Sequence, residues 1–127
     1  EHPIPIWFNE GVAQLHEEDK VVKADELMRQ LIPRGVYVPM ATLNALDIRG
    51  ETDQARVGIF YAQSVSVINF LIQQQGSKKF GILCRALRDG KDFEEALGFS
   101  YATNIDTLEQ LENKWLSYMK NEDFIVR

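Results

Sequence analysis

The sequence has very little of several residue types on which catalytic and cofactor sites depend. It contains a single cysteine, Cys84, and two histidines, His2 and His16. One thiol cannot build a disulfide framework or a Cys-type zinc site. Two poorly placed histidines give no Ser/His/Asp or Cys/His set, and no glycine-rich phosphate loop is present. These classes of site are therefore excluded for this chain.

Long apolar runs and clustered positive charge are also lacking. No apolar run approaches the length of about 18 residues that a membrane-spanning helix needs. The net charge is −5, and the acidic residues are spread along the chain. Nucleic-acid and anionic-membrane surfaces favour clustered Lys and Arg instead. We therefore expect no membrane-spanning segment and no nucleic-acid partner.

What is present fits one helical domain. The chain has 127 residues, of which 45% are hydrophobic and 26% are charged, as in ordinary globular domains. Apolar residues recur at a spacing of three to four. We predict an all-α fold, an irregular bundle of five to seven helices around a long central helix, as a single domain over residues 1–127. The predicted helices cover about residues 7–18, 21–32, 40–46, 52–75, 77–88, 92–97 and 105–120.

Several helix ends carry recognisable signals. Thr52 or Asp53 is a suitable N-cap for the central helix, and Gly76 ends it. Residues 92–95 form a capping-box pattern, and Gly98 is expected to stop the short helix that follows. Residues 36–53 are the least regular part of the chain. We expect that segment to wrap the surface.

The opening helix has one packed side and one side that bears carboxylates. Trp7, Gly11 and Leu15 recur at helical spacing and give a buried stripe. Glu10 and Gln14 fall on a neighbouring stripe. By periodicity alone, Glu10 is a first-turn acid that the helix dipole stabilises.

The run Trp-Phe-Asn-Glu-Gly-Val-Ala at residues 7–13 resembles the W-[LF]-[NS]-E-G-[LFV]-A signature of gluzincin metallopeptidases. That group contains thermolysin, the aminopeptidase-N-like enzymes and the bacterial peptidase MA-like domains. Its members carry an upstream H-E-x-x-H, which supplies two zinc-ligating histidines and a general-base glutamate. The Glu of the N-E-G run is their third zinc ligand. The resemblance therefore implies that Glu10 is a zinc ligand.

The likeness extends along most of the chain, although only residues 7–13 are specific. Peptidase MA-like domains continue with a long helix that contains a pattern similar to Tyr-Ala-Gln-Ser at 61–64. An Ala-Leu-Gly turn at 96–98 and a final helix with Trp115 follow in the family's order. In zinc peptidases a tyrosine or histidine often stabilises the oxyanion of the tetrahedral intermediate. By resemblance, Tyr61 is the candidate for that catalytic role.

The chain departs from the family in one important way, because it contains no H-E-x-x-H. The nearest string, at residues 16–20, ends in Lys20 and lies after Glu10 rather than before it. We therefore expect the chain to be the C-terminal helical part of a larger peptidase-like domain. It would contribute a zinc ligand and a cleft wall, with zinc bound and peptide substrate cleaved only in the intact protein. The uncovered face, around Trp7, Glu10 and Tyr61, would be apolar and would promote self-association.

Simpler interpretations stay open for each candidate. Tyr61 is equally explained as a core tyrosine with its hydroxyl at the bundle edge. Gln14 is either a hydrogen-bond partner behind the metal or a solvated side chain. His2 and His16 are interpreted as surface histidines, and Cys84 as an inert core thiol. For the whole chain, the alternative is a non-catalytic helical module for protein interaction. The sequence leaves the cellular location open, and the resemblance to bacterial domains favours an extracytoplasmic one.

Overall fold

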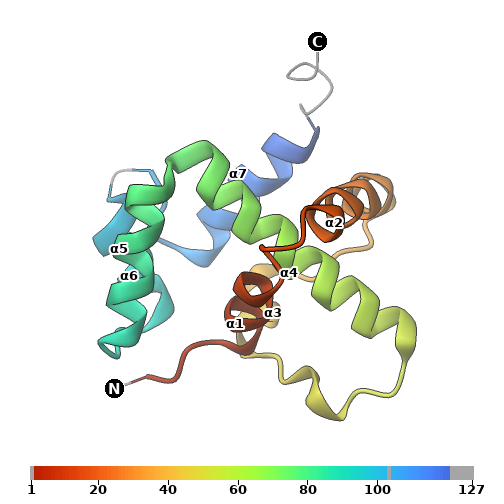
Figure 1. The fold of residues 1–127 in the computed structure, drawn as a ribbon, viewed down its shortest axis with the longest axis horizontal. Helices are drawn as coiled ribbons and strands as arrows, with labels where there is room; N and C mark the ends of the chain where they lie inside the picture. Colours follow the sequence, from red (N-terminus) through yellow and green to blue (C-terminus); the bar gives the residue numbers. More distant parts are fainter. Residues whose placement is uncertain (1, 103, 121–127) are drawn as a thin grey trace.

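A computed structural model describes residues 2–102 and 104–120, and these fold as seven α-helices without a strand (Figure 1). The predicted all-α bundle is confirmed. Two short 3-10 turns, η1 (Ile32–Arg34) and η2 (Ile48–Gly50), complete the regular structure. The helices are α1 (Ile6–Ala13), α2 (Glu18–Leu31), α3 (Met40–Ala45), α4 (Gln54–Gln75), α5 (Ser77–Arg88), α6 (Phe93–Tyr101) and α7 (Leu108–Lys120).

The long helix α4 is the centre of the bundle, as the two apolar faces of its sequence predict. It runs diagonally across Figure 1 and contacts α1, α2, α5 and α7. The Asp53 carboxylate accepts a hydrogen bond from the amide of Ala55 at 3.0 Å, which confirms the predicted N-cap. Gly76, with a φ of 91°, ends the helix where predicted. This positive φ is open to glycine at no steric cost.

Helix α4 is also long and apolar enough to cross a membrane, by length and composition alone. The expectation of no spanning segment did not allow for this. However, 56% of its most hydropathic window is buried against the other helices. Burial of this kind is what the core helix of a bundle requires, so the apolar character of α4 is accounted for by packing.

Four of the predicted helix boundaries are wrong by three residues or more. The first helix stops at Ala13 rather than near residue 18, and α2 begins at Glu18 after a hydrogen-bonded turn. Helix α6 continues through Gly98 to Tyr101, because the buried Ser100 and Tyr101 side chains hold that last turn on the core.

The last helix starts at Leu108, three residues later than predicted. The Thr107 hydroxyl accepts a hydrogen bond from the amide of Gln110 at 3.0 Å, and Glu94 Oε2 accepts one from the amide of Leu108 at 2.8 Å. These two side chains satisfy the free N–H groups of the first turn. They therefore fix the start of α7 at a place that apolar spacing does not reveal.

The segment before α4 runs over the surface, as expected for residues 36–53, but three of its apolar side chains reach into the core. Met40 and Leu43 of α3 are fully buried. The amide of Gln63 on α4 donates to the carbonyl of Val38 at 2.6 Å and accepts from its N–H at 2.8 Å. Glu112 of α7 accepts from the amide of Met40 at 2.7 Å. Polar side chains on two helices thus hold this extended chain in place.

An aromatic cluster joins α1 to the C-terminal helices. The Phe8 ring stacks on Phe80 of α5 with centroids 5.7 Å apart, and Trp7 lies 5.4 Å from Phe93 of α6, edge to face. The Trp7 indole N–H donates to Asn44 Oδ1 at 3.0 Å, which satisfies its buried polar atom. The expectation that Trp7 is a packing residue is confirmed, and Phe8 is buried beside it.

Candidate functional site: the crossing of α1 and α4

Helix α1 crosses α4 at an unusually close approach, and Gly11 makes that approach possible. A Cβ atom built on Gly11 would lie 2.8 Å from the carbonyl oxygen of Ser64 and 2.8 Å from Cγ1 of Ile68. The Ser64 hydroxyl is turned back onto its own helix, where it donates to the carbonyl of Phe60 at 2.7 Å. The glycine in the Asn-Glu-Gly run and the serine in the Tyr-Ala-Gln-Ser run therefore meet at one contact.

Glu10, next to Gly11, is a half-buried acid without a partner among the described residues. Because α1 begins at Ile6, Glu10 lies in the second turn, which corrects the expectation of a first-turn acid. Within residues 2–102 and 104–120, its carboxylate forms no hydrogen bond and no ion pair. Partly buried carboxylates are normally hydrogen-bonded or paired, because desolvation of a charged group is costly. Gln14, one turn later, is also half-buried, and its side chain forms no hydrogen bond with the described residues. The Asn9 side chain is exposed.

Glu10 and Tyr61 both belong to the two helices that meet at this crossing. Glu10 stands next to Gly11 on α1 and is turned about 160° around the helix axis from Phe8, which stacks on Phe80 of α5. Tyr61 belongs to the N-terminal half of α4, one turn before the Ser64 contact.

Tyr61 itself is half-buried at the edge of the core. Its ring packs edge to face against Phe60 with centroids 5.4 Å apart. Its hydroxyl makes no hydrogen bond to any described residue. A phenol in this position can donate a hydrogen bond to a group that arrives from outside the bundle.

The described residues do not form a metal site by themselves. No group of three or more His, Cys, Asp or Glu side chains is gathered closely enough to hold an ion within residues 2–102 and 104–120. His2 and His16 are both exposed, as expected, and His2 Nδ1 lies 3.2 Å from the carbonyl of Gly90, far along the sequence from Glu10. Zinc in a hydrolytic site needs three protein ligands. Any metal held by Glu10 would therefore need its other ligands from outside these residues.

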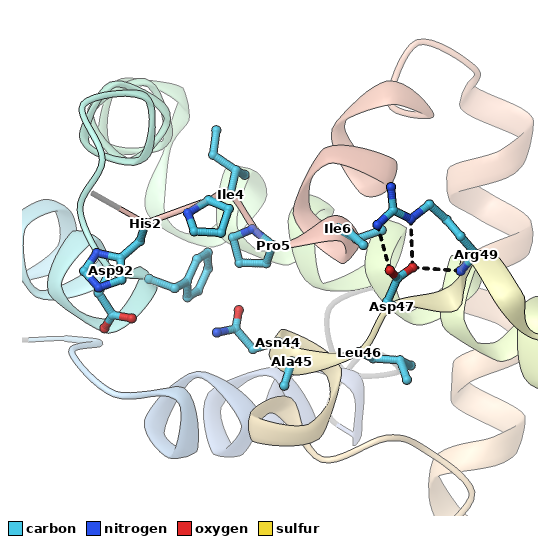
Figure 2. Close-up of a pocket in the computed structure, with 12 residues that line it drawn as sticks. His2, Ile4, Pro5, Ile6, Asn44, Ala45, Leu46, Asp47, Arg49 and Asp92 are labelled. Carbon is cyan, nitrogen blue, oxygen red and sulfur yellow. Dashed lines mark hydrogen bonds and ion pairs between the residues drawn. The ribbon is translucent and has the colours of Figure 1, made fainter.

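A separate hollow of about 380 Å³ opens beside the N-terminus of α1 (Figure 2). At one end Arg49 pairs with Asp47, with Nη2 2.7 Å from Oδ2 and Nε 2.8 Å from Oδ1. These hydrogen bonds lower the pKa of Asp47 to about 2. Neither Glu10 nor Tyr61 lines this hollow. Its walls are His2, Pro3, Ile4, Pro5, Ile6, Asn44, Ala45, Leu46, Asp47, Arg49, Asp92 and Phe93.

Cys84 offers no alternative nucleophile. The side chain is half-buried on α5, and burial raises the pKa of its thiol. A thiol with a raised pKa is protonated at neutral pH and reacts slowly. Burial likewise raises the pKa of Tyr101, the nearby buried phenol. The expectation of an inert core thiol is therefore consistent with this environment.

The predicted bare apolar face around Trp7 is wrong. Trp7 is 0% exposed, because α3 and α6 cover it. The large apolar side chains that are exposed, among the described residues, lie elsewhere and are not gathered at the crossing: Val22, Leu27, Val36 and Phe99.

A comparison with protein families gave a match over most of the chain. The sequence profile described as the peptidase MA superfamily matches residues 1–121. The chain belongs to the peptidase MA superfamily. Comparisons with curated proteins and with solved structures gave no match. The superfamily match extends over all seven helices, so it includes both sides of the α1–α4 crossing.

Sequence reasoning missed one polar residue of this peptidase-family domain, Gln63. Its side chain is 0% exposed, and it holds the backbone of Val38 through two hydrogen bonds. The signal was available, since Gln63 is a large polar residue in the middle of a helix predicted to be central. A buried glutamine must find partners for its amide. Its position therefore predicts a contact with backbone outside α4, although not which segment.

Proposed function

We propose that this domain supplies one zinc ligand, Glu10, and a wall of the substrate cleft to a zinc-dependent peptidase of the gluzincin type. The observation that carries the proposal is the half-buried, unpaired carboxylate of Glu10 at the α1–α4 crossing of a peptidase MA domain. A carboxylate oxygen is a suitable zinc ligand. Because no described residue forms an ion pair with the Glu10 carboxylate, that carboxylate is available to bind a metal ion.

The remaining ligands would be two histidines of an H-E-x-x-H segment outside these residues. This follows from the donor set, because the described residues gather no second or third ligand near Glu10. When bound in such a site, zinc polarises a carbonyl and activates water. The isolated chain is accordingly proposed to bind zinc weakly and to cleave no peptide.

Tyr61 is proposed as a hydrogen-bond donor to the substrate carbonyl oxygen as negative charge develops on it. Support comes from its position on α4 one turn before the Ser64 contact with α1, and from a hydroxyl that is not committed to another described residue. In this proposal the bundle holds a carboxylate on α1 and a phenol on α4. The close contact at Gly11 fixes the distance between these two helices.

The first test is a calorimetric zinc titration of the 127-residue chain at neutral pH. The proposal predicts dissociation constants far above micromolar, because a single carboxylate is a weak site. Sub-micromolar one-to-one binding would show that the ligand set has been wrongly assigned. Titration of the Glu10→Gln chain provides the reference for non-specific binding.

The second test uses a longer protein in which an H-E-x-x-H segment precedes residue 1. Tyr61→Phe should lower kcat by about 10²–10³, the cost of removing one oxyanion donor, while zinc content stays unchanged. Tyr37→Phe is the matched control, because Tyr37 is another half-buried tyrosine, which packs on Trp115 instead. Equal activity of both variants would remove Tyr61 from the site. A longer protein that binds no zinc would favour the non-catalytic interaction module.

A further inference from the structure

The outer face of α5 is rich in Lys and Arg, although the chain as a whole has a negative net charge. Residues 77–91 contain five Lys or Arg and one Asp, in a chain whose net charge is −5. Lys78, Arg85 and Arg88 are exposed, and Arg85 lies two turns after Lys78 on the same side of the helix. None of the three forms an ion pair with any residue that the structure describes.

The helix dipole does not account for this pattern. Arg85 and Arg88 lie in the last turn of α5, where cations are favourable, but Lys78 lies in the first turn, where a cation is unfavourable. The first turn of α5 contains no acidic residue. The positive stripe is therefore not explained by the stability of α5 alone.

A hollow with an apolar wall adjoins the stripe. It has a volume of about 460 Å³ and lies between α5 and α6. Phe99, which is 65% exposed, forms one wall, and the Lys91 ammonium lies 5.2 Å from the centre of its ring. The rest of the lining comes from α5 and the residue after it: Ile82, Arg85, Ala86 and Asp89. The hollow thus joins apolar surface to two cationic groups and one carboxylate.

We propose that this α5–α6 face, defined by Lys78, Ile82, Arg85, Lys91 and Phe99, docks an acidic segment of a partner protein that inserts one apolar side chain into the hollow. Charge complementarity selects an acidic partner, since unpaired cations attract carboxylates and steer their approach. The concave, apolar hollow favours a peptide side chain over a lipid surface, because membrane-bound helices present protruding apolar side chains instead. Within the chain, the face is separate from Glu10 and does not depend on the zinc-site proposal.

The test measures fluorescence anisotropy of a fluorescein-labelled peptide, rich in Asp and Glu with one central Phe, added to the whole chain. We expect saturable binding that weakens when salt is raised. The double variant Lys78→Glu/Arg85→Glu should weaken binding by about tenfold or more, since two attractive contacts become repulsive. Phe99→Ser should weaken it several-fold, as should replacement of the peptide's Phe by Ser.

The matched control is Lys23→Glu/Lys114→Glu, which changes the net charge equally at two exposed lysines on α2 and α7. Binding within about twofold of the original chain is expected for this control, and circular dichroism melts show that both double variants fold. The proposal is overturned if the control loses as much binding as the α5 variant, or if the peptide does not bind. It is also overturned if phosphatidylserine vesicles bind with the same dependence on Lys78 and Arg85 while the peptide does not.

Discussion

Replacing Gly11 with alanine tests how closely α1 must approach α4. The added Cβ would lie 2.8 Å from the Ser64 carbonyl oxygen and 3.1 Å from its carbon, and both are backbone atoms that no rotamer change can move away. Overpacking of this kind costs about 1–3 kcal/mol, and the upper half of that range applies because the obstacle is backbone. The better helix propensity of alanine returns about 1 kcal/mol. We expect a net loss of about 1–2 kcal/mol.

Gly58 provides the matched control, because it also lies inside a helix but a Cβ there meets nothing within 4 Å. Gly58→Ala should therefore stabilise the chain by up to about 1 kcal/mol. The two variants should differ by about 2–3 kcal/mol, which is on the order of 10 °C in Tm for a domain of this size. Thermal melts followed by circular dichroism measure this directly. Equal or higher stability of Gly11→Ala would refute the close-approach argument.

Three further outcomes follow from the structure. Leu83→Ala, at a fully buried position, should cost about 2–5 kcal/mol in a denaturant titration, and a loss below 1 kcal/mol would contradict its core role. Gln63→Ala should cost about 2–4 kcal/mol, because it leaves the N–H and C=O of Val38 without partners. Hydrogen exchange at the Val38 amide should become faster, and an unchanged rate would contradict the two hydrogen bonds from Gln63. The Asp47 carboxyl should titrate with a pKa of about 2 by NMR, and Arg49→Gln should return it towards about 3.9. Since the folded pKa of Asp47 is the lower one, its contribution to stability is present above about pH 4 and is lost as the pH falls to about 2.

The parts of the fold that were predictable are those fixed by local pattern. The apolar spacing of α4, its Asp53 cap and its Gly76 end are all properties of neighbouring residues. The failures share a different cause, which is a partner distant in sequence. Glu94 accepts a hydrogen bond from the first residue of α7, and Gln63 accepts one from the amide of Val38. Neither hydrogen bond can be recognised from the spacing of residues in the sequence.

The candidate site divides in the same way. Glu10 is a candidate because of the sequence motif at residues 7–13, and Tyr61 because of its place in the motif at 61–64. Neither choice needed the structure. That their two helices meet closely depends on the contact of Gly11 with Ser64, which lies far away in the sequence. The expected bare face failed for a related reason, since Trp7 is covered by Asn44 of α3 and Phe93 of α6, and the spacing of apolar residues does not show which helices meet.

The central claim is most directly tested by the zinc content of a longer protein that includes an H-E-x-x-H segment before residue 1. Purified Glu10→Gln protein should have lost most of its zinc, with metal affinity reduced by more than the 10–100-fold typical of outer-shell changes, while its Tm without added metal stays within a few degrees. Glu26→Gln, the same change at an exposed acid on α2, should keep full zinc content. Full zinc content and peptidase rate in Glu10→Gln would contradict the account and leave Glu10 as an ordinary half-buried acid of α1.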